Sequence, residues 1–113
     1  MPITTNIGQN AESLVSEYLQ QKGHKILFCN WRTKLCEIDI VSQKNDIVYC
    51  CEVRYRKSSN WGSGFDSITP KKLKQVNFSA ELWAHNNKWD GQIRILVAQV
   101  SGDPPMLDDI IEL

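Results

Sequence analysis

Four charged residues stand at alternate positions in two stretches of strand-forming sequence. Glu37 and Asp39 lie in a segment that alternates in polarity, and Glu52 and Arg54 lie in one rich in Val, Tyr and Cys. Successive side chains on a strand point to opposite faces, so the members of each pair share one face. Carboxylate oxygens suit Mg²⁺, which keeps water and phosphate in its remaining positions. A divalent cation held here could generate hydroxide and stabilise the charge of a displaced phosphodiester.

The turn between these two strands decides how close the carboxylates come. An even-length loop over residues 43–46 pairs position 42 with 47, 39 with 50 and 37 with 52. In that register all four charged side chains share one sheet face, and Asp39 lies diagonal to Glu52 at about 7–8 Å. Alternating charges of this kind are also typical of a solvated face of an antiparallel sheet. Their position in the two most strand-prone segments, near a helix that carries another acid, favours the chemical interpretation.

The elements that must position these residues follow in the order helix, three strands, helix, strand and tail. The predicted ranges are 8–22 for the first helix, 25–31, 37–42 and 47–55 for the strands, 92–100 for the last strand and 106–113 for a short final segment. The second helix starts with Thr69 as N-cap and Pro70 in its first turn. This order predicts an α/β fold with a mixed sheet flanked by two helices.

Both predicted helices have an apolar stripe that a sheet would cover. In the first helix the stripe comprises Ala11, Leu14, Val15, Tyr18 and Leu19. Glu12 lies on the border of that stripe, from which it can reach toward the sheet, and Glu17 faces away. In the second helix Leu73, Val76, Ala80, Trp83 and Ala84 form the stripe.

A second apolar pair, Phe78 and Leu82, lies on the other side of the second helix. Either the C-terminal tail or a second subunit covers this pair, and we favour the tail. A homodimer is therefore the open alternative.

Length and composition bound the rest. The chain has 113 residues, which is enough for a single domain over 1–113, with residues 103–113 as an acidic tail. It lacks an apolar run of roughly 20 residues and a signal-peptide pattern, so we expect a cytoplasmic protein without a membrane partner. We expect its four cysteines to be reduced and to act as small hydrophobic residues, with Cys50 and Cys51 on opposite faces of one strand.

Positive charge is concentrated locally although the chain as a whole is neutral. Bases and acids number 13 each, but residues 103–113 hold four acids and no base, which leaves +4 on residues 1–102. Between positions 53 and 88, seven bases stand against two acids. A local basic surface is what contact with phosphates requires. The candidates for nucleic-acid binding are Arg56, Lys57, Lys71, Lys72 and Lys74, with Trp61 as a residue that could stack on an unpaired base.

An ordered set of residues from Gly8 to Val97 resembles the YraN-like family, small bacterial endonuclease-like proteins of the PD-(D/E)XK nuclease superfamily, related in fold to archaeal Holliday-junction resolvases. The matching residues are Gly8, Glu12, Tyr18-Leu19, Asn30-Trp31-Arg32, Glu37-Ile38-Asp39-Ile40, Glu52-Val53-Arg54, Arg56, Ile68, Lys71-Lys72, Ala80 and Arg94. The resemblance implies a restriction-endonuclease-like αβββαβ core, which agrees with the order of elements above.

The resemblance also implies a set of site residues. Asp39 and Glu52 would bind Mg²⁺ or Mn²⁺ together with the backbone carbonyl of Val53, and Glu12 would approach the metal or its water. Glu37 would support the site. The substrate would be DNA, in particular branched or otherwise structured DNA.

The chain departs from the family pattern at three positions. Cys36 stands where the family has Gly, Arg54 where it has Lys, and Leu96 where it has Asp. An arginine stays charged and cannot act as a base, although it can clamp a phosphate through paired hydrogen bonds. Three functions therefore remain open: an endonuclease, a degenerate member that binds nucleic acid without cutting it, and a protein-interaction module that uses Phe78 and Leu82.

Overall fold

The computed structural model describes residues 7–57 and 68–113, with side chains described from residue 10 onward. It contains one five-stranded sheet in the order β1-β2-β3-β4-β5, in which only β3 and β4 are parallel. The elements are α1 (Ile7–Gln21), β1 (Lys25–Arg32), β2 (Glu37–Lys44), β3 (Ile47–Arg56), α2 (Pro70–Asn86), β4 (Gln92–Ser101) and β5 (Met106–Glu112). The fold is α/β with a mixed sheet and two helices, as predicted, and is consistent with a restriction-endonuclease-like core.

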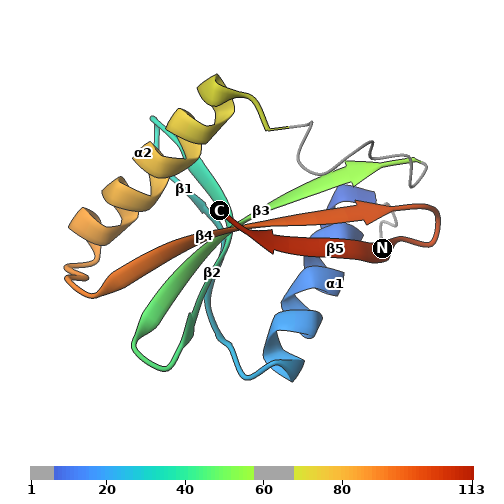
Figure 1. Ribbon diagram of the computed structural model, residues 1–113, viewed down its shortest axis with the longest axis horizontal. Coiled ribbons are helices and arrows are strands. Elements are labelled where there is room, and N and C mark those ends of the chain that lie inside the picture. The colour runs from blue at the N-terminus through green and yellow to red at the C-terminus, as the bar shows by residue number, and fades with distance from the viewer. Residues whose placement is uncertain (1–6, 58–67) are drawn as a thin grey trace.

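The two helices cover opposite faces of the sheet (Figure 1). Ala11, Val15 and Leu19 of α1 are buried against one face, and Ala80 and Trp83 of α2 are buried against the other. These residues belong to the predicted apolar stripes. Burying both faces explains why the middle strands are nearly continuous in apolar residues.

Adjacent cysteines mark the two faces. Cys51 belongs to the apolar cluster under α1 and Cys50 to the cluster under α2, and both are about 1% exposed. All four cysteines are free thiols; Cys50 and Cys51 are buried as predicted for small hydrophobic residues, whereas Cys29 is exposed.

The predicted register of the β2–β3 hairpin is wrong by two residues. The strands pair as far as Lys44 with Ile47, so the turn contains only Asn45 and Asp46, and Asn45 adopts a φ of 57°. Such two-residue turns match the twist of paired strands and favour Asn at positive φ. Because the error is even, it leaves Asp39 and Glu52 on the same side of the sheet, where both line one cleft. The pairing ends at Ile40 and Cys51, directly before Asp39 and Glu52.

Local signals account for the helix ends. Gly23 has a φ of +95°, which lets the chain leave α1 without a steric penalty. At the start of α2 the Thr69 hydroxyl accepts a hydrogen bond from the Lys72 N–H at 3.1 Å, and Pro70 follows in the first turn. The burial prediction fails for Leu73, which remains 37% exposed at this end of the helix.

The C-terminal segment does not cover Phe78, which corrects the prediction we favoured. Residues 106–112 form β5, which pairs with β4 and packs Leu107 and Ile110 against the cluster under α1. The side chain of Phe78 is 46% exposed. Among the described residues, no helix is long and apolar enough to cross a membrane.

Candidate functional site

An open cleft of about 640 Å³ lies between α2 and the start of β2, beside the middle of β3. Its lining combines carboxylates, amines and apolar side chains. The lining residues are Leu35, Cys36, Glu37, Asp39, Glu52, Val53, Lys72, Lys74, Gln75, Val76, Phe78 and Ser79. The fold therefore brings three of the four predicted acids into one cleft.

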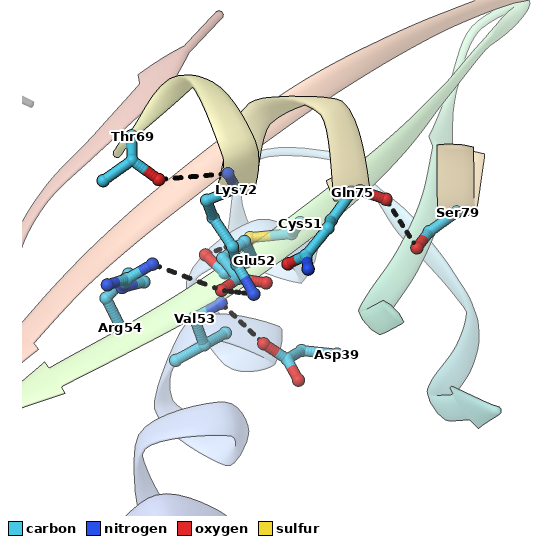
Figure 2. Close-up of polar contacts among 9 residues, drawn as sticks. All are labelled: Asp39, Cys51, Glu52, Val53, Arg54, Thr69, Lys72, Gln75 and Ser79. Atoms are coloured by element: carbon cyan, nitrogen blue, oxygen red, sulfur yellow. Dashed lines mark hydrogen bonds and ion pairs between the residues drawn. The ribbon is translucent and has the colours of Figure 1, made fainter. Parts of the chain in front are cut away.

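Asp39 is fixed in position by the backbone of the neighbouring strand. Its Oδ2 atom accepts a hydrogen bond from the Val53 N–H at 2.8 Å, just beyond the last paired residues of the two strands (Figure 2). Burial, with a further contribution from the charges of Glu52, Glu12 and Glu37, raises the pKa of Asp39 to about 7 despite the opposing hydrogen bond from the Val53 N–H. The Asp39 carboxyl thus lies among acids and holds a proton far above the ordinary range.

Glu12 of α1 meets Asp39 as expected for a residue on the border of its helix. Contacts with the Asn30 and Asp39 side chains lower the pKa of Glu12. Burial outweighs them and raises the pKa of Glu12, with a further contribution from the charge of Glu37. Burial and neighbouring acids therefore raise the pKa of both Glu12 and Asp39.

Glu52 has the opposite surroundings. Its Oε2 atom lies 3.1 Å from Lys72 Nζ and 3.6 Å from an Arg54 guanidinium nitrogen. Figure 2 shows these two cations approaching the carboxylate from α2 and from β3. The Glu52 side chain is 17% exposed, so water screens these pairs less than it would at the surface.

Glu37 lies at the rim of the cleft. Its carboxylate forms an ion pair with Arg32 at 3.5 Å, and the two side chains are 46% and 67% exposed. An exposed pair of this kind contributes little to stability. Its negative charge nevertheless contributes to the raised pKa of both Asp39 and Glu12.

The structure divides the five basic residues predicted to bind nucleic acid. Lys72 and Lys74 line the cleft, whereas Arg56, Lys57 and Lys71 are exposed outside its lining. The tryptophan predicted to stack on a base, Trp61, lies outside the described residues.

Sequence reasoning missed three features of the site. It placed Lys72 on the binding surface and did not foresee its contact with Glu52, because no local pattern links a helix start to a strand 20 positions earlier. It also assigned no role to Asn30, although Asn is one of the few residues that adopt positive φ readily, and Asn30 has a φ of 56°. Leu35 and Phe78 were not recognised as part of a cleft.

The departures from the family pattern fall in different environments. Cys36 lines the cleft, and its N–H donates to the Thr33 hydroxyl in the turn between β1 and β2. Leu96 is buried in the cluster under α1. The second of these positions therefore belongs to the core in this chain.

The donor chemistry of the cleft fits a divalent cation in part. The described residues contain no group of three or more His, Cys, Asp or Glu side chains arranged as a ready site. However, Mg²⁺ commonly takes only one or two carboxylates and completes its octahedron with water and phosphate. Asp39 and Glu52 border the same cleft and raise each other's energy as anions, a repulsion that a cation between them would remove.

Comparison with known proteins identifies relatives along most of the chain. Residues 11–100 match the family described as uncharacterised protein family UPF0102. A UPF0102 protein of Renibacterium salmoninarum is 32% identical over 108 residues, which is 92% of each chain. UPF0102 proteins of Flavobacterium psychrophilum and Pseudomonas fluorescens are 35% and 37% identical, over 84% and 73% of this chain and 80% and 69% of their own lengths.

Proposed function

The chain belongs to the UPF0102 family, the YraN family, and from this premise we propose that it is a metal-dependent endonuclease that hydrolyses phosphodiester bonds in branched or otherwise structured DNA. One observation carries the proposal: Asp39 and Glu52, from adjacent strands, face a cleft that Lys72 and Lys74 also line. Carboxylates suited to a divalent cation lie next to amines suited to a phosphate.

Asp39 and Glu52 are the metal ligands in this proposal, and the Val53 carbonyl is the third. The Val53 N–H holds Asp39 in place, and Glu12, whose pKa is raised by burial, takes up the proton that the attacking water gives up. A bound Mg²⁺ or Mn²⁺ would supply positive charge for the phosphate and make an attacking water more acidic. In the reaction, water oxygen forms a new bond to phosphorus, the ester P–O bond breaks, and the departing oxygen receives a proton.

Arg54 and Lys72 divide the work that the family pattern gives to one lysine. Arg54 cannot lose its proton, so it serves as a clamp for the scissile phosphate through paired hydrogen bonds. Lys72 brings an amine to the same carboxylate from α2, within 3.1 Å of Glu52. An amine can orient the attacking water and, unlike a guanidinium, exchange a proton with it. We therefore assign the orienting role to Lys72.

A cleavage assay tests the proposal. The substrates are supercoiled, duplex, single-stranded and four-way-junction DNA, each with Mg²⁺, Mn²⁺ or EDTA. We expect metal-dependent cutting that is strongest on the junction and is roughly 1,000-fold slower in Asp39→Asn. Glu17→Gln is the matched control, because Glu17 is exposed on α1 away from the cleft. Absence of cutting under every condition contradicts the endonuclease proposal.

A second candidate, binding of DNA without cleavage, is favoured by one contact. Arg54 occupies the motif position and pairs with Glu52, so a single residue could have disabled an otherwise complete site. This candidate predicts that the native chain binds DNA in a salt-sensitive way without cutting, and that Arg54→Lys gains cleavage.

A further inference from the structure

Phe78 is an exposed aromatic residue inside the cleft. It lies on α2, lines the same cavity as Asp39 and Glu52, and is 46% exposed. Leu35, in the turn before β2, lines the cavity as well and is 71% exposed. Single apolar residues are common on protein surfaces, but these two border a cavity whose other walls carry carboxylates and amines.

Lys74 and Phe78 form an adjacent cation and aromatic ring on one helix. Residues four positions apart on a helix are neighbours, with Cβ atoms about 5–6 Å apart. Both residues are exposed and both line the cleft. A ligand that contacts the ring is therefore also within reach of the ammonium group.

We propose that Phe78 forms a stacking platform for one unpaired nucleobase, with Lys74 on the phosphate of the same strand. This inference rests on the proposed function, in that it takes nucleic acid as the ligand, and it names the substrate feature that the cleft selects. A nucleotide matches the lining because it combines a flat apolar ring with a charged phosphate. The cleft volume of about 640 Å³ falls within the roughly 300–1,000 Å³ of ordinary ligand pockets.

The base must be unpaired for this contact to form. In a duplex each base face is covered by its neighbours, so a side chain reaches a face only where the strand is single or splayed open. Junctions, flaps and single-strand gaps offer such bases next to duplex. The stacking platform thus provides a physical reason for a preference for structured DNA.

A second copy of this chain is a less suitable occupant. The apolar part of the cleft comprises few residues, and the carboxylates and amines around it would lose their water in a protein interface. A nucleic-acid strand instead supplies phosphates to the amines and one ring to the apolar wall.

The test uses the full chain in EDTA, so that binding is measured without cleavage. The probe is a single-stranded oligonucleotide with one 2-aminopurine, whose fluorescence is quenched on stacking, with a blunt duplex of the same sequence for comparison. We expect quenching by the native protein and by Phe78→Tyr. Phe78→Leu should lose the quenching and bind the single strand roughly tenfold more weakly, since stacking on an aromatic side chain contributes about 1–3 kcal/mol per base. Its duplex affinity should not change.

Matched controls make the result specific. Phe28→Leu removes another partly exposed phenylalanine, one that lies on β1 outside the cleft lining, and it should behave like the native protein. Lys74→Gln should weaken binding to single strand and duplex alike and reduce the salt dependence. Thermal unfolding of each variant checks that the fold is retained.

Three outcomes overturn the inference. Equal quenching in Phe78→Leu and the native chain would show that the ring is not the platform. If Phe78→Leu changes the oligomeric state measured by sedimentation but leaves the quenching unchanged, this face is an interface between copies of the chain. Failure to bind any oligonucleotide would also refute it. A native protein that cuts DNA but shows no quenching retains the proposed function and loses only the stacking platform.

Discussion

Asp39 and Glu52 are assigned the same role but lie in opposite electrostatic surroundings. Glu52 is held by two cations of its own chain, Arg54 and Lys72. Asp39 has acids for neighbours, is held by a backbone N–H and has a raised pKa. Cations of the chain therefore balance the charge of one carboxylate, whereas burial and neighbouring acids oppose the charge of the other.

This difference separates two costs of binding a cation. At Asp39 a cation must displace a proton, so binding there depends on pH. At Glu52 it must compete with Lys72 and Arg54, which could turn to the phosphate of a substrate instead. The two regions would then exchange partners when metal and DNA bind together.

The largest effect is expected at Asp39. Asp39→Asn keeps an oxygen for the Val53 N–H but removes the negative charge, so cleavage in Mg²⁺ should fall roughly 1,000-fold, because a metal contributes several kcal/mol to the charge of the transition state. Single-turnover cleavage of junction DNA measures it, with Glu17→Gln as control. Native-like cleavage by Asp39→Asn would remove the basis of the comparison.

Substitution of Lys72, one of the two cations that pair with Glu52, should have a smaller effect on cleavage. Lys72→Gln should lower cleavage roughly 100-fold, the lower range for a group that handles a proton. Lys72→Arg keeps the charge but should not restore activity, whereas the double variant Lys72→Gln/Arg54→Lys should recover part of it. Lys71→Gln, at the neighbouring exposed position, is the control. Full activity of Lys72→Arg would mean that charge alone matters there.

Stability without metal should depend on pH through Asp39. Its pKa rises from 3.8 to about 7 on folding, so between these values the folded chain holds a proton that the unfolded chain has released. The contribution of Asp39 to stability is therefore greatest below pH 4 and is lost as the pH rises toward 7. In EDTA at pH 8, Asp39→Asn should be more stable than the native chain by roughly 1–2 kcal/mol, after allowance for partial solvent exposure.

Denaturant unfolding at pH 4 and pH 8 measures this difference. The advantage of Asp39→Asn should be mostly lost at pH 4, where the aspartate is protonated in the folded state and close to half protonated in the unfolded state. Saturating Mg²⁺ at pH 8 should stabilise the native chain more than the variant. If Asp39→Asn is more stable than the native chain by the same amount at both pH values, the negative charge of Asp39 does not destabilise the folded chain.

His24, which belongs to neither the Asp39 nor the Glu52 surroundings, should make stability depend weakly on pH, with the opposite sign to Asp39. Burial lowers its pKa from 6.5, with a contribution from the charge of Lys44, and its Nδ1 lies 2.9 Å from the Ser42 hydroxyl. The unfolded state then binds the proton more readily, so this contribution to stability is complete above pH 6.5 and is lost as the pH falls below it. In the Asp39→Asn background, His24→Gln should flatten the remaining slope between pH 7 and 5. An unchanged slope would exclude His24 as its source.

Features set by neighbouring residues could be predicted from the sequence, and features set by distant ones could not. Thr69-Pro70 and Gly23 marked the helix ends, because caps and left-handed residues act within a few positions. The face shared by Asp39 and Glu52 followed from the two-residue period of strands. The hairpin register was missed because Gln43 and Lys44 were taken as part of the loop, although Asn45 and Asp46 suffice for the turn.

Strand β5 and the contact between Lys72 and Glu52 were not predicted, for a different reason. In β5 the doubled residues Asp108-Asp109 and Ile110-Ile111 break the alternation that identifies a strand, and its pairing with β4 decides the structure. The approach of Lys72 to Glu52 depends on how α2 packs across the sheet, which no window of sequence contains.

The adjacent thiols of Cys50 and Cys51 lie in different halves of the core, so the labelling rate of each can report the opening of its own half. Burial raises the pKa of Cys50 to about 12 and that of Cys51 as well, so neither should react with a thiol reagent until its own layer opens. With Cys29 and Cys36 replaced by serine, the labelling rate of each thiol would report the opening of one helix from the sheet. The labelling rate of Cys51 would thus measure how often α1 separates from the sheet, and that of Cys50 how often α2 does.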